Sequence, residues 1–501
     1  MKLWGHHSAS LFRFLVLSLG PVATFVLVFR YLIAHFYNGG YLLDSGVFAQ
    51  LIWHNVRQLS QHVPTRESYY LVHVTPLLSL LSLISYAVPI TKISYFCGFV
   101  ACVSASYAAL TAWVLNCRYF KTSTLLVVTV TSALSALSGL MLGPILYPHY
   151  EQTLCVAAGV FAYCLLVQRN LALTVLGFGV AILTREDGGL HVGLLLLSVI
   201  LAKFARVKIR VPYRQLFAYL VIAVVASAGM IAIHKSLPNS FSSFNNAFAD
   251  NWESIGRLFT SDQIYLRLRY VILERPWIWV PLAVAVLFAL HFRDWGYLVG
   301  YGSNVPWFVL LITADYGATS TFSLYYGFPF IIGHTWALVW AVVSGVPRRT
   351  AVIMGLTLAL GGIHPGTLNE LLRVDVSSSQ IGKTEAMNRV LLKQLSMPNV
   401  PFAADASVGA MIPDVVPPER IITPSGGPAG TQVILFSGCY RLDRDAVLRF
   451  AQLAQLYELA KVEGTEYYLA AKSKNVVKEW GLALRWVTYF AMADAVRCHG
   501  R

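Results

Sequence analysis

The sequence predicts a polytopic α-helical membrane protein with a small α/β domain near its C-terminal end. Three observations lead to this fold class. The 501 residues are 56% hydrophobic and only 12% charged, whereas soluble domains carry about 25% charged residues. The mean hydropathy is +0.60. Long apolar stretches follow one another up to about residue 363, and beyond them the composition becomes that of a soluble domain.

Eleven apolar stretches are long enough, or nearly long enough, to cross a bilayer, which takes about 20 residues. They are residues 11–33, 93–116, 122–143, 152–168, 170–184, 188–203, 215–234, 277–291, 296–314, 324–344 and 349–363. One further stretch, 74–90, has Pro76 in its first turn, where proline is tolerated. We expect it to be a re-entrant or juxtamembrane segment.

Basic residues give the orientation, because lysine and arginine are retained on the cytoplasmic side. The strongest basic loop carries five of them between 203 and 214. Six turns that carry basic residues all lie on the cytoplasmic side only if the stretch 74–90 does not cross the bilayer fully. We therefore predict a multi-pass protein of the cell's inner (cytoplasmic) membrane with a cytoplasmic N-terminus. The segments left facing the periplasm or exterior are 34–73, 144–151, 185–187, 235–276, 315–323 and everything after about 364.

The chain divides into three predicted parts. Residues 1–363 form the membrane module, and its first outer loop, 34–73, contains an amphipathic stretch at 46–60. Residues 364–475 alternate strand-like and helical patterns, which predicts a small extracytoplasmic α/β domain. The tail, 476–501, mixes aromatic and basic residues and is predicted to be an interfacial amphipathic helix. The predicted elements of the α/β domain are strands at 374–377, 432–436 and 467–471 and helices at 385–395 and 444–456.

Composition also excludes some classes of function. The net charge of +14 comes from basic residues in short loops between apolar stretches. No basic face with interleaved aromatic residues occurs, so the sequence does not predict nucleic-acid binding. The seven cysteines include no Cys-x-x-Cys pair, which argues against a zinc site or a redox motif.

Charged residues at the ends of membrane helices need an explanation, because a charge at a helix centre costs about 2.5–3.5 kcal/mol on insertion scales. Asp44 is the most informative of them, since it follows the first apolar stretch directly. A helix N-cap would give it a structural role only. The alternative is a catalytic carboxylate, and spacing does not separate the two.

Two more charged groups fall on the same predicted face. His149 and Glu151 lie between two apolar stretches. They form either a helix-capping turn or a pair of ligands for a divalent cation. Arg185, Glu186 and Asp187 interrupt an apolar run. They form either a solvated hairpin tip or a phosphate-binding arginine beside carboxylates that hold it or a metal ion.

A fourth group, Asp315 to Gly317 with Ser323 to Pro329, includes Tyr325 and Tyr326 and fits an interfacial aromatic belt by itself. Four polar groups on one predicted face, below a soluble domain, suit an active site reached from the membrane on one side and from water on the other.

In this order the motifs resemble the GT-C class of integral membrane glycosyltransferases, and most closely a group of bacterial membrane proteins with that presumed fold. The group has Asp-x-Gly-x-Phe-x-Gln in its first outer loop, His-x-x-Pro before an apolar helix, and His-Pro-Glu and Lys-Glu-Asp between later helices. This chain departs from it at Tyr150 and Arg185. The matching stretches are Asp44 to Gln50, His73 to Pro76, His149 to Glu151, Arg185 to Asp187, Tyr325 to Pro329 and Ala404 to Val408.

The resemblance implies a GT-C-like fold that moves a sugar from a polyprenyl-phosphate carrier to a hydroxyl acceptor: an envelope glycan, a lipid or a protein. Asp44 would be the general base, flanked by His73. Arg185, His149, Tyr325 and Tyr326 would bind the donor phosphate. No cofactor is certain. A divalent cation, Mg²⁺ or Mn²⁺, would be held by Glu151, Glu186 and Asp187.

Two other classes of function stay open. A transporter or flippase for a lipid-linked or small polar solute would place charges near the membrane midplane and often contains repeats. This chain has no internal repeat, and its charges gather at one predicted face. An assembly protein without chemistry is the third alternative.

Overall fold

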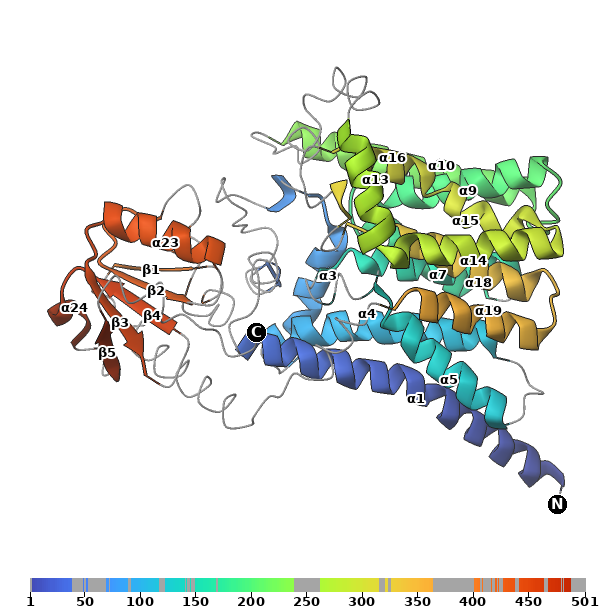
Figure 1. The fold of residues 1–501 in the computed structure, drawn as a ribbon, viewed down its shortest axis with the longest axis horizontal. Helices are drawn as coiled ribbons and strands as arrows, with labels where there is room; N and C mark the ends of the chain where they lie inside the picture. The colour runs from blue at the N-terminus through green and yellow to red at the C-terminus, as the bar shows by residue number, and fades with distance from the viewer. Residues whose placement is uncertain are drawn as a thin grey trace. The chain divides into compact units, whose positions relative to one another are not determined.

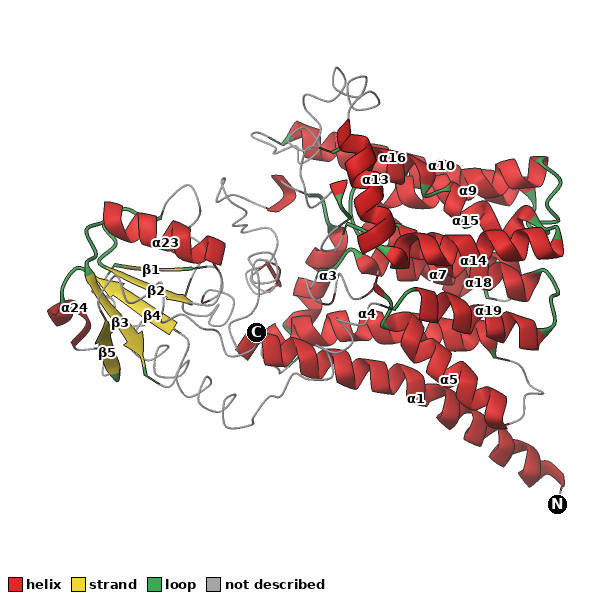
Figure 2. Ribbon diagram, viewed as in Figure 1, coloured by secondary structure: helices red, strands yellow, loops and turns green. Residues whose placement is uncertain are grey.

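The computed structural model describes most of the helical region and part of the C-terminal third. The described residues are 2–37, 48, 51–52, 69–71, 73–88, 92–116, 122–139, 141, 145, 149–167, 170–237, 262–314, 320–322, 326–363, 401–405, 408, 416, 420, 422, 427–437, 441–463, 467–478, 480 and 482–487. Figure 2 shows helices over the N-terminal two thirds of the chain and strands in the C-terminal third.

Each predicted apolar stretch coincides with a helix or, for 296–314, with a run of short helices (Figure 1). In chain order these are α1 (Lys2–Tyr37), α4 (Lys92–Leu115), α5 (Thr122–Ala136), α7 (Gln152–Val167), α8 (Leu171–Leu183), α9 (Gly188–Phe204), α10 (Tyr213–Ser236), α14 (Pro276–Phe292), η2 (Trp295–Leu298), α15 (Val299–Gly302), α16 (Val305–Ile312), α18 (Phe330–Val343) and α19 (Arg348–Gly361). Outside them lie η1 (Tyr69–Leu71), α3 (Pro76–Ser85) and α13 (Asp262–Glu274).

Membrane association follows from the length and composition of these helices. Among the described residues, three are long and apolar enough to cross a bilayer: Leu11–Ala34 within α1, Ser94–Leu115 within α4, and α10. The bent pair α13–α14 would add a fourth if it is one span. The other apolar helices are shorter, so eleven crossings stay a prediction. Helix α3 has 10 residues, which is short of a full crossing.

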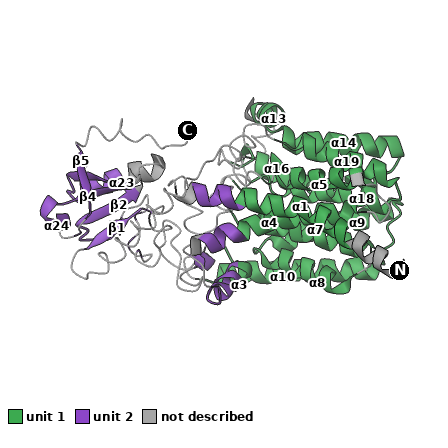
Figure 3. Ribbon diagram, turned by 90° about the horizontal axis from the view of Figure 1, so that it is seen from below, with its two compact units in different colours: residues 1–28, 73–77, 99–372 green, residues 29–72, 78–98, 373–501 purple. Residues whose placement is uncertain are grey.

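The chain forms two compact units, drawn in different colours in Figure 3. The first contains residues 1–28, 73–77 and 99–372. In it α7 packs against α8 and α18, and α9 against α10. Glycines permit the close approach: a Cβ on Gly177 would lie 2.9 Å from the carbonyl oxygen of Ala157, and one on Gly189 would lie 2.7 Å from Ser227 Oγ and overlap the backbone of Ala223.

The second unit contains residues 29–72, 78–98 and 373–501. Its C-terminal part has a five-stranded sheet in the order β1-β2-β4-β3-β5. The β1–β2 pair is parallel and the other three pairs are antiparallel. Helix α23 packs against β2, and α24 follows β4. The elements are β1 (Phe402–Ala404), β2 (Val433–Ser437), α23 (Arg441–Leu453), β3 (Glu458–Val462), β4 (Tyr467–Ala471), α24 (Lys474–Lys478) and β5 (Leu484–Val487).

The predicted strands at 432–436 and 467–471 and the predicted helix at 444–456 correspond to β2, β4 and α23. The predicted elements at 374–377 and 385–395 lie outside the described residues, as does most of the amphipathic stretch 46–60. In the N-terminal part of this unit, the Phe48 ring contacts the rings of Tyr69 and Phe96, with centroids 6.0 and 6.2 Å away.

The prediction for the tail was wrong at residues 484–487. We expected 476–501 to be one interfacial helix, but Leu484–Val487 is strand β5, paired with β3. Leu484 and Trp486 are half-buried while Arg485 between them is exposed. Alternation with a period of two is the pattern of a strand. The sequence analysis assigned a helix instead, because the tail is rich in aromatic residues.

Candidate functional site

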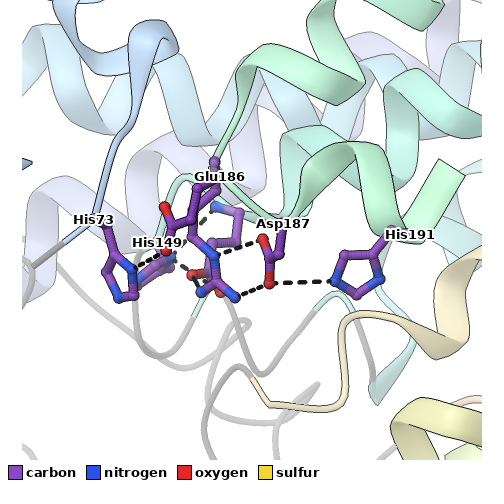
Figure 4. Close-up of polar contacts among 7 residues, drawn as sticks. His73, His149, Glu186, Asp187 and His191 are labelled. Atoms are coloured by element: carbon purple, nitrogen blue, oxygen red, sulfur yellow. Dashed lines mark hydrogen bonds and ion pairs between the residues drawn. The ribbon is translucent and has the colours of Figure 1, made fainter. Parts of the chain in front are cut away.

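Charged residues from three distant parts of the sequence meet at one end of the helical unit. His73 precedes α3, Glu151 precedes α7, and Arg185, Glu186 and Asp187 connect α8 to α9. The His73 Nδ1 and Glu186 Oε1 atoms are 2.7 Å apart although 113 residues separate them in sequence. Figure 4 shows His73 and His149 beside Glu186, and Asp187 facing His191. We call these residues, with Glu151 and Arg185, the charged cluster.

Local structure explains why these residues meet. Helices α8 and α9 form a hairpin, and α7 packs along α8, so the start of α7 lies beside the α8–α9 turn. Thr184 Oγ1 donates a hydrogen bond to the carbonyl of Val180 at 2.8 Å and ends α8. Asp187 occupies the N-cap position of α9 without capping a backbone N–H. Its carboxylate is therefore available to side chains.

Arg185 lies at the centre of the charged cluster. Its Nε donates to Asp187 Oδ1 at 2.8 Å, Nη2 donates to Asp187 Oδ2, and Nη1 donates to Glu151 Oε1. The side chains of Arg185 and Glu151 are only 18% and 3% exposed. Burial opposes the charge on Arg185, but Asp187 and Glu151 outweigh it and hold the pKa of Arg185 above its usual range. The guanidinium is thus a fixed, neutralised cation.

The three carboxyl groups of the charged cluster are not equivalent. Burial raises the pKa of Glu151, and the nearby Arg185 offsets this only in part. For Asp187, burial is outweighed by Arg185 and His191, so its pKa lies well below the usual range. For Glu186, burial is outweighed by His73 and then Arg185, so its pKa is also lowered. Glu151 is therefore the carboxyl group that most readily holds a proton.

His149 stays neutral near neutral pH. Its ring is buried and stacks on Tyr150, with the centroids 4.8 Å apart. Nδ1 accepts the backbone N–H of Glu151 at 3.3 Å, which leaves the ring proton on Nε2 in the neutral form. Burial, then Arg185 and then His73 lower the pKa of His149.

Sequence reasoning missed His191. Its Nε2 is 3.7 Å from Asp187 Oδ2, and its ring stacks on Trp307 of α16 at 3.9 Å, with 13° between the planes. Phe328 lies 5.5 Å away. The signal was present: residues 187 and 191 are four apart at the start of a helix, so they share a face.

The predicted metal ligands are mostly engaged by other side chains. Both oxygens of Asp187 accept from Arg185. Glu151 Oε2 and Glu186 Oε2 are buried and have no hydrogen-bond partner among the described residues. Over the same part of the chain, no group of three or more His, Cys, Asp or Glu side chains has the geometry to hold a metal ion. Glu151 and Glu186 therefore fit a cation better than Asp187 does.

Of the remaining predicted site residues, the structure describes Tyr326. Asp44 and Tyr325 lie outside the described residues. Tyr326 is half-buried in the turn before α18, two residues from Phe328, whose ring lies beside His191. The segment that carries Tyr326 thus reaches the edge of the charged cluster.

No protein-family model matches the chain, and no curated protein matches it either.

Proposed function

We propose that the protein is a membrane glycosyltransferase. It moves a sugar from a polyprenyl-phosphate carrier to a hydroxyl acceptor on the extracytoplasmic face of the inner membrane. The observation that supports this most is the convergence of His73, Glu151 and Arg185 to Asp187 into one buried charged cluster. These residues come from three of the motifs that carry the GT-C resemblance.

The reaction needs a base and a leaving-group site. The acceptor oxygen attacks the anomeric carbon as its proton passes to a base, while the bond from that carbon to the phosphate oxygen breaks. We assign the base role to Asp44, and the resemblance assigns His73 to assist it. The short contact between His73 and Glu186 supports this role for His73, because a carboxylate partner fixes the orientation of an imidazole ring.

Arg185 is the proposed ligand of the phosphate. Three of its five N–H groups donate to Asp187 and Glu151, so two are left to contact a phosphate oxygen. One guanidinium among three carboxyl groups leaves the charged cluster acidic, however. His149, Tyr325 and Tyr326 would add contacts to the phosphate. When bound, a Mg²⁺ or Mn²⁺ ion held by Glu151 and Glu186, with Asp187 nearby, would supply positive charge to the leaving phosphate.

The helical unit offers surfaces for the lipid carrier. Apolar side chains such as Leu171, Val225 and Leu287 are more than half exposed, as expected where helices face lipid. A polyprenyl chain fits against such faces, with its phosphate at the charged cluster.

The test is sugar transfer by purified protein in liposomes, with a panel of radiolabelled polyprenyl-phosphate sugars. We expect product from the wild type, loss of product for Asp44→Asn and Glu186→Gln, and unchanged product for Glu458→Gln. Glu458 is a matched control because its ion pair with Lys474 is exposed. Chelation by EDTA tests whether sugar transfer needs a divalent cation. If the wild type consumes no donor across the panel but moves a solute across the bilayer, the protein is a transporter.

A further inference from the structure

Helix α13 (Asp262–Glu274) has an apolar side that is exposed in the described part of the structure. Tyr265 is 67% exposed, Leu266 57%, Ile272 55% and Leu273 62%. On a helical wheel these residues and Tyr270 share one side, with the exposed Arg269 in its middle. A soluble protein would bury such a side, because contiguous exposed apolar surface marks a contact with another phase or partner.

The opposite side of α13 fixes the helix to the rest of the unit. Val271 is buried and Leu268 packs against the core. Arg267 Nη1 donates to the carbonyl of Ile312, the last residue of α16, at 2.8 Å. Trp279 Nε1 on α14 donates to the carbonyl of Ile272 at 2.8 Å. The exposed side is therefore held in one orientation.

The direction of α13 sets it apart from the helices around it. It is bent by 79° relative to α14, which follows after one residue. Figure 1 shows α14, α18 and α19 running side by side and α13 running steeply away from the first end of α14. Arg275 stabilises the corner: its Nε donates to the carbonyl of Thr321 at 3.2 Å, and its guanidinium lies 5.2 Å from the ring of Trp277.

We propose that α13 lies flat in the headgroup region of the bilayer, with its apolar side against the acyl chains. If α14 runs along the membrane normal, a 79° bend places α13 nearly in the membrane plane. Tyrosine beside leucine and isoleucine is the composition of an interfacial helix. Arg269 can extend along this side to a lipid phosphate, as long basic side chains do at interfaces. The occupant of this surface is the lipid itself.

This placement gives the depth of the charged cluster. Helix α13 contacts the end of α16 at Ile312, and Trp307, five residues earlier on α16, stacks on His191. Five residues of helix span about 7.5 Å. The charged cluster then lies roughly one and a half helical turns from the headgroup level, within reach of a lipid phosphate. The inference about α13 itself does not depend on the proposed function.

Photocrosslinking of the full chain in vesicles tests the proposal. Tyr265 is replaced by p-benzoylphenylalanine, and the vesicles contain phosphatidylcholine with or without phosphatidylglycerol. Tyr457 in the sheet region is a matched control, since it is also a tyrosine 67% exposed. Leu287 on α14, 64% exposed, is the positive control. Mass spectrometry then separates lipid adducts from protein adducts.

We expect lipid adducts at Tyr265 in a yield similar to that at Leu287 and several-fold above that at Tyr457. Leu273 is a second position on the same side that must give the same result, so misfolding of one variant does not decide the outcome. A yield at the level of Tyr457 at both positions, while Leu287 gives adducts, overturns the proposal. Crosslinks from Tyr265 to a second copy of the chain overturn it as well, because they would identify a protein interface.

Arg269 provides a separate readout in the same vesicles. We expect Arg269→Gln to lower the share of phosphatidylglycerol among the lipid adducts at Tyr265, because a cation beside that position attracts the anionic lipid. An unchanged share would refute the contact between Arg269 and the phosphate.

Discussion

Two ion-paired regions of the molecule differ in almost every respect except the chemistry of the pair. In the charged cluster, Arg185 joins Glu151 and Asp187, and the three side chains are 18%, 3% and 15% exposed. In the sheet region, Lys474 Nζ lies 3.8 Å from Glu458 Oε2, with the two side chains 57% and 42% exposed.

The two regions differ in how much hydration their charges lose on folding. Two exposed charges lose little water on pairing, so their pair contributes about 0–1 kcal/mol. Buried charges lose most of their hydration, and breaking one buried pair costs about 3–5 kcal/mol. A protein keeps such a group where it needs fixed charges, and this supports a functional role for the charged cluster.

The largest effect is expected for Arg185→Gln. It leaves Glu151 and Asp187 buried without their cation, so the free energy of unfolding should fall by about 3–5 kcal/mol. Unfolding in mild detergent, followed by circular dichroism, measures the change. Adding Glu151→Gln should restore part of the loss, because it removes one unpaired charge. If Arg185→Gln costs no more than Glu458→Gln, the contrast between the two regions is false.

Gly189→Ala tests the packing that holds the α8–α9 turn in place. A Cβ at this position overlaps the backbone of Ala223 and Ser227 Oγ, and overpacking of this kind costs about 1–3 kcal/mol. Gly179→Ala is the matched control, since a Cβ there meets nothing within 4 Å. It should stabilise its helix by up to about 1 kcal/mol. A thermal midpoint that falls equally for both variants would argue against close packing of α9 on α10.

His149→Gln should change how stability depends on pH. The folded-state pKa of His149 is lowered well below 6.5. As the pH falls below about 6.5, the unfolded chain therefore binds a proton that the folded protein resists, and stability declines. Glutamine removes this contribution, so the variant should lose less stability than the wild type between about pH 7 and pH 5. Thermal midpoints over this range measure it, and identical slopes would show that His149 does not titrate in this way.

The smallest effect is expected for Glu458→Gln. An exposed pair of this length should contribute less than about 1 kcal/mol, and less still at high salt. Urea unfolding at low and high salt checks both statements. A salt-insensitive loss of several kcal/mol would mean that Glu458 supports the sheet in some other way.

The sequence predicted most helices of the membrane module because each is an apolar stretch, but it left α13, which contains Arg267 and Arg269, in an outer loop. It did not predict which of them are long enough to cross a membrane: the stretch 296–314 was predicted as one span, and the structure divides it into η2, α15 and α16. Residues 484–487 were misassigned because Trp480 and Trp486 suggested an interface, while the pairing partner, β3, lies more than 20 residues earlier.

The charged cluster was predicted in part. The alternation of apolar stretches placed His149, Glu151 and Arg185 on one face, and the structure brings them into contact. The sequence suggested that carboxylates of the same turn hold Arg185, as Asp187 does. It could not indicate that Glu151 is the second partner, because that depends on how α7 meets the α8–α9 turn. Nor could it identify the stacking of His191 on Trp307, which joins residues 116 positions apart.

The sequence positions of the partners of Arg185 have a consequence for biosynthesis. Glu151 lies earlier in the chain, and Asp187 is made two residues later. Glu186, next to Arg185, contacts His73, which is synthesised before Glu151. The ribosome has therefore made every counter-charge in this group by the time the α8–α9 hairpin leaves it. The hairpin can enter the membrane with Arg185 already paired, whereas Trp307 and Phe328, whose rings lie beside His191, are made later.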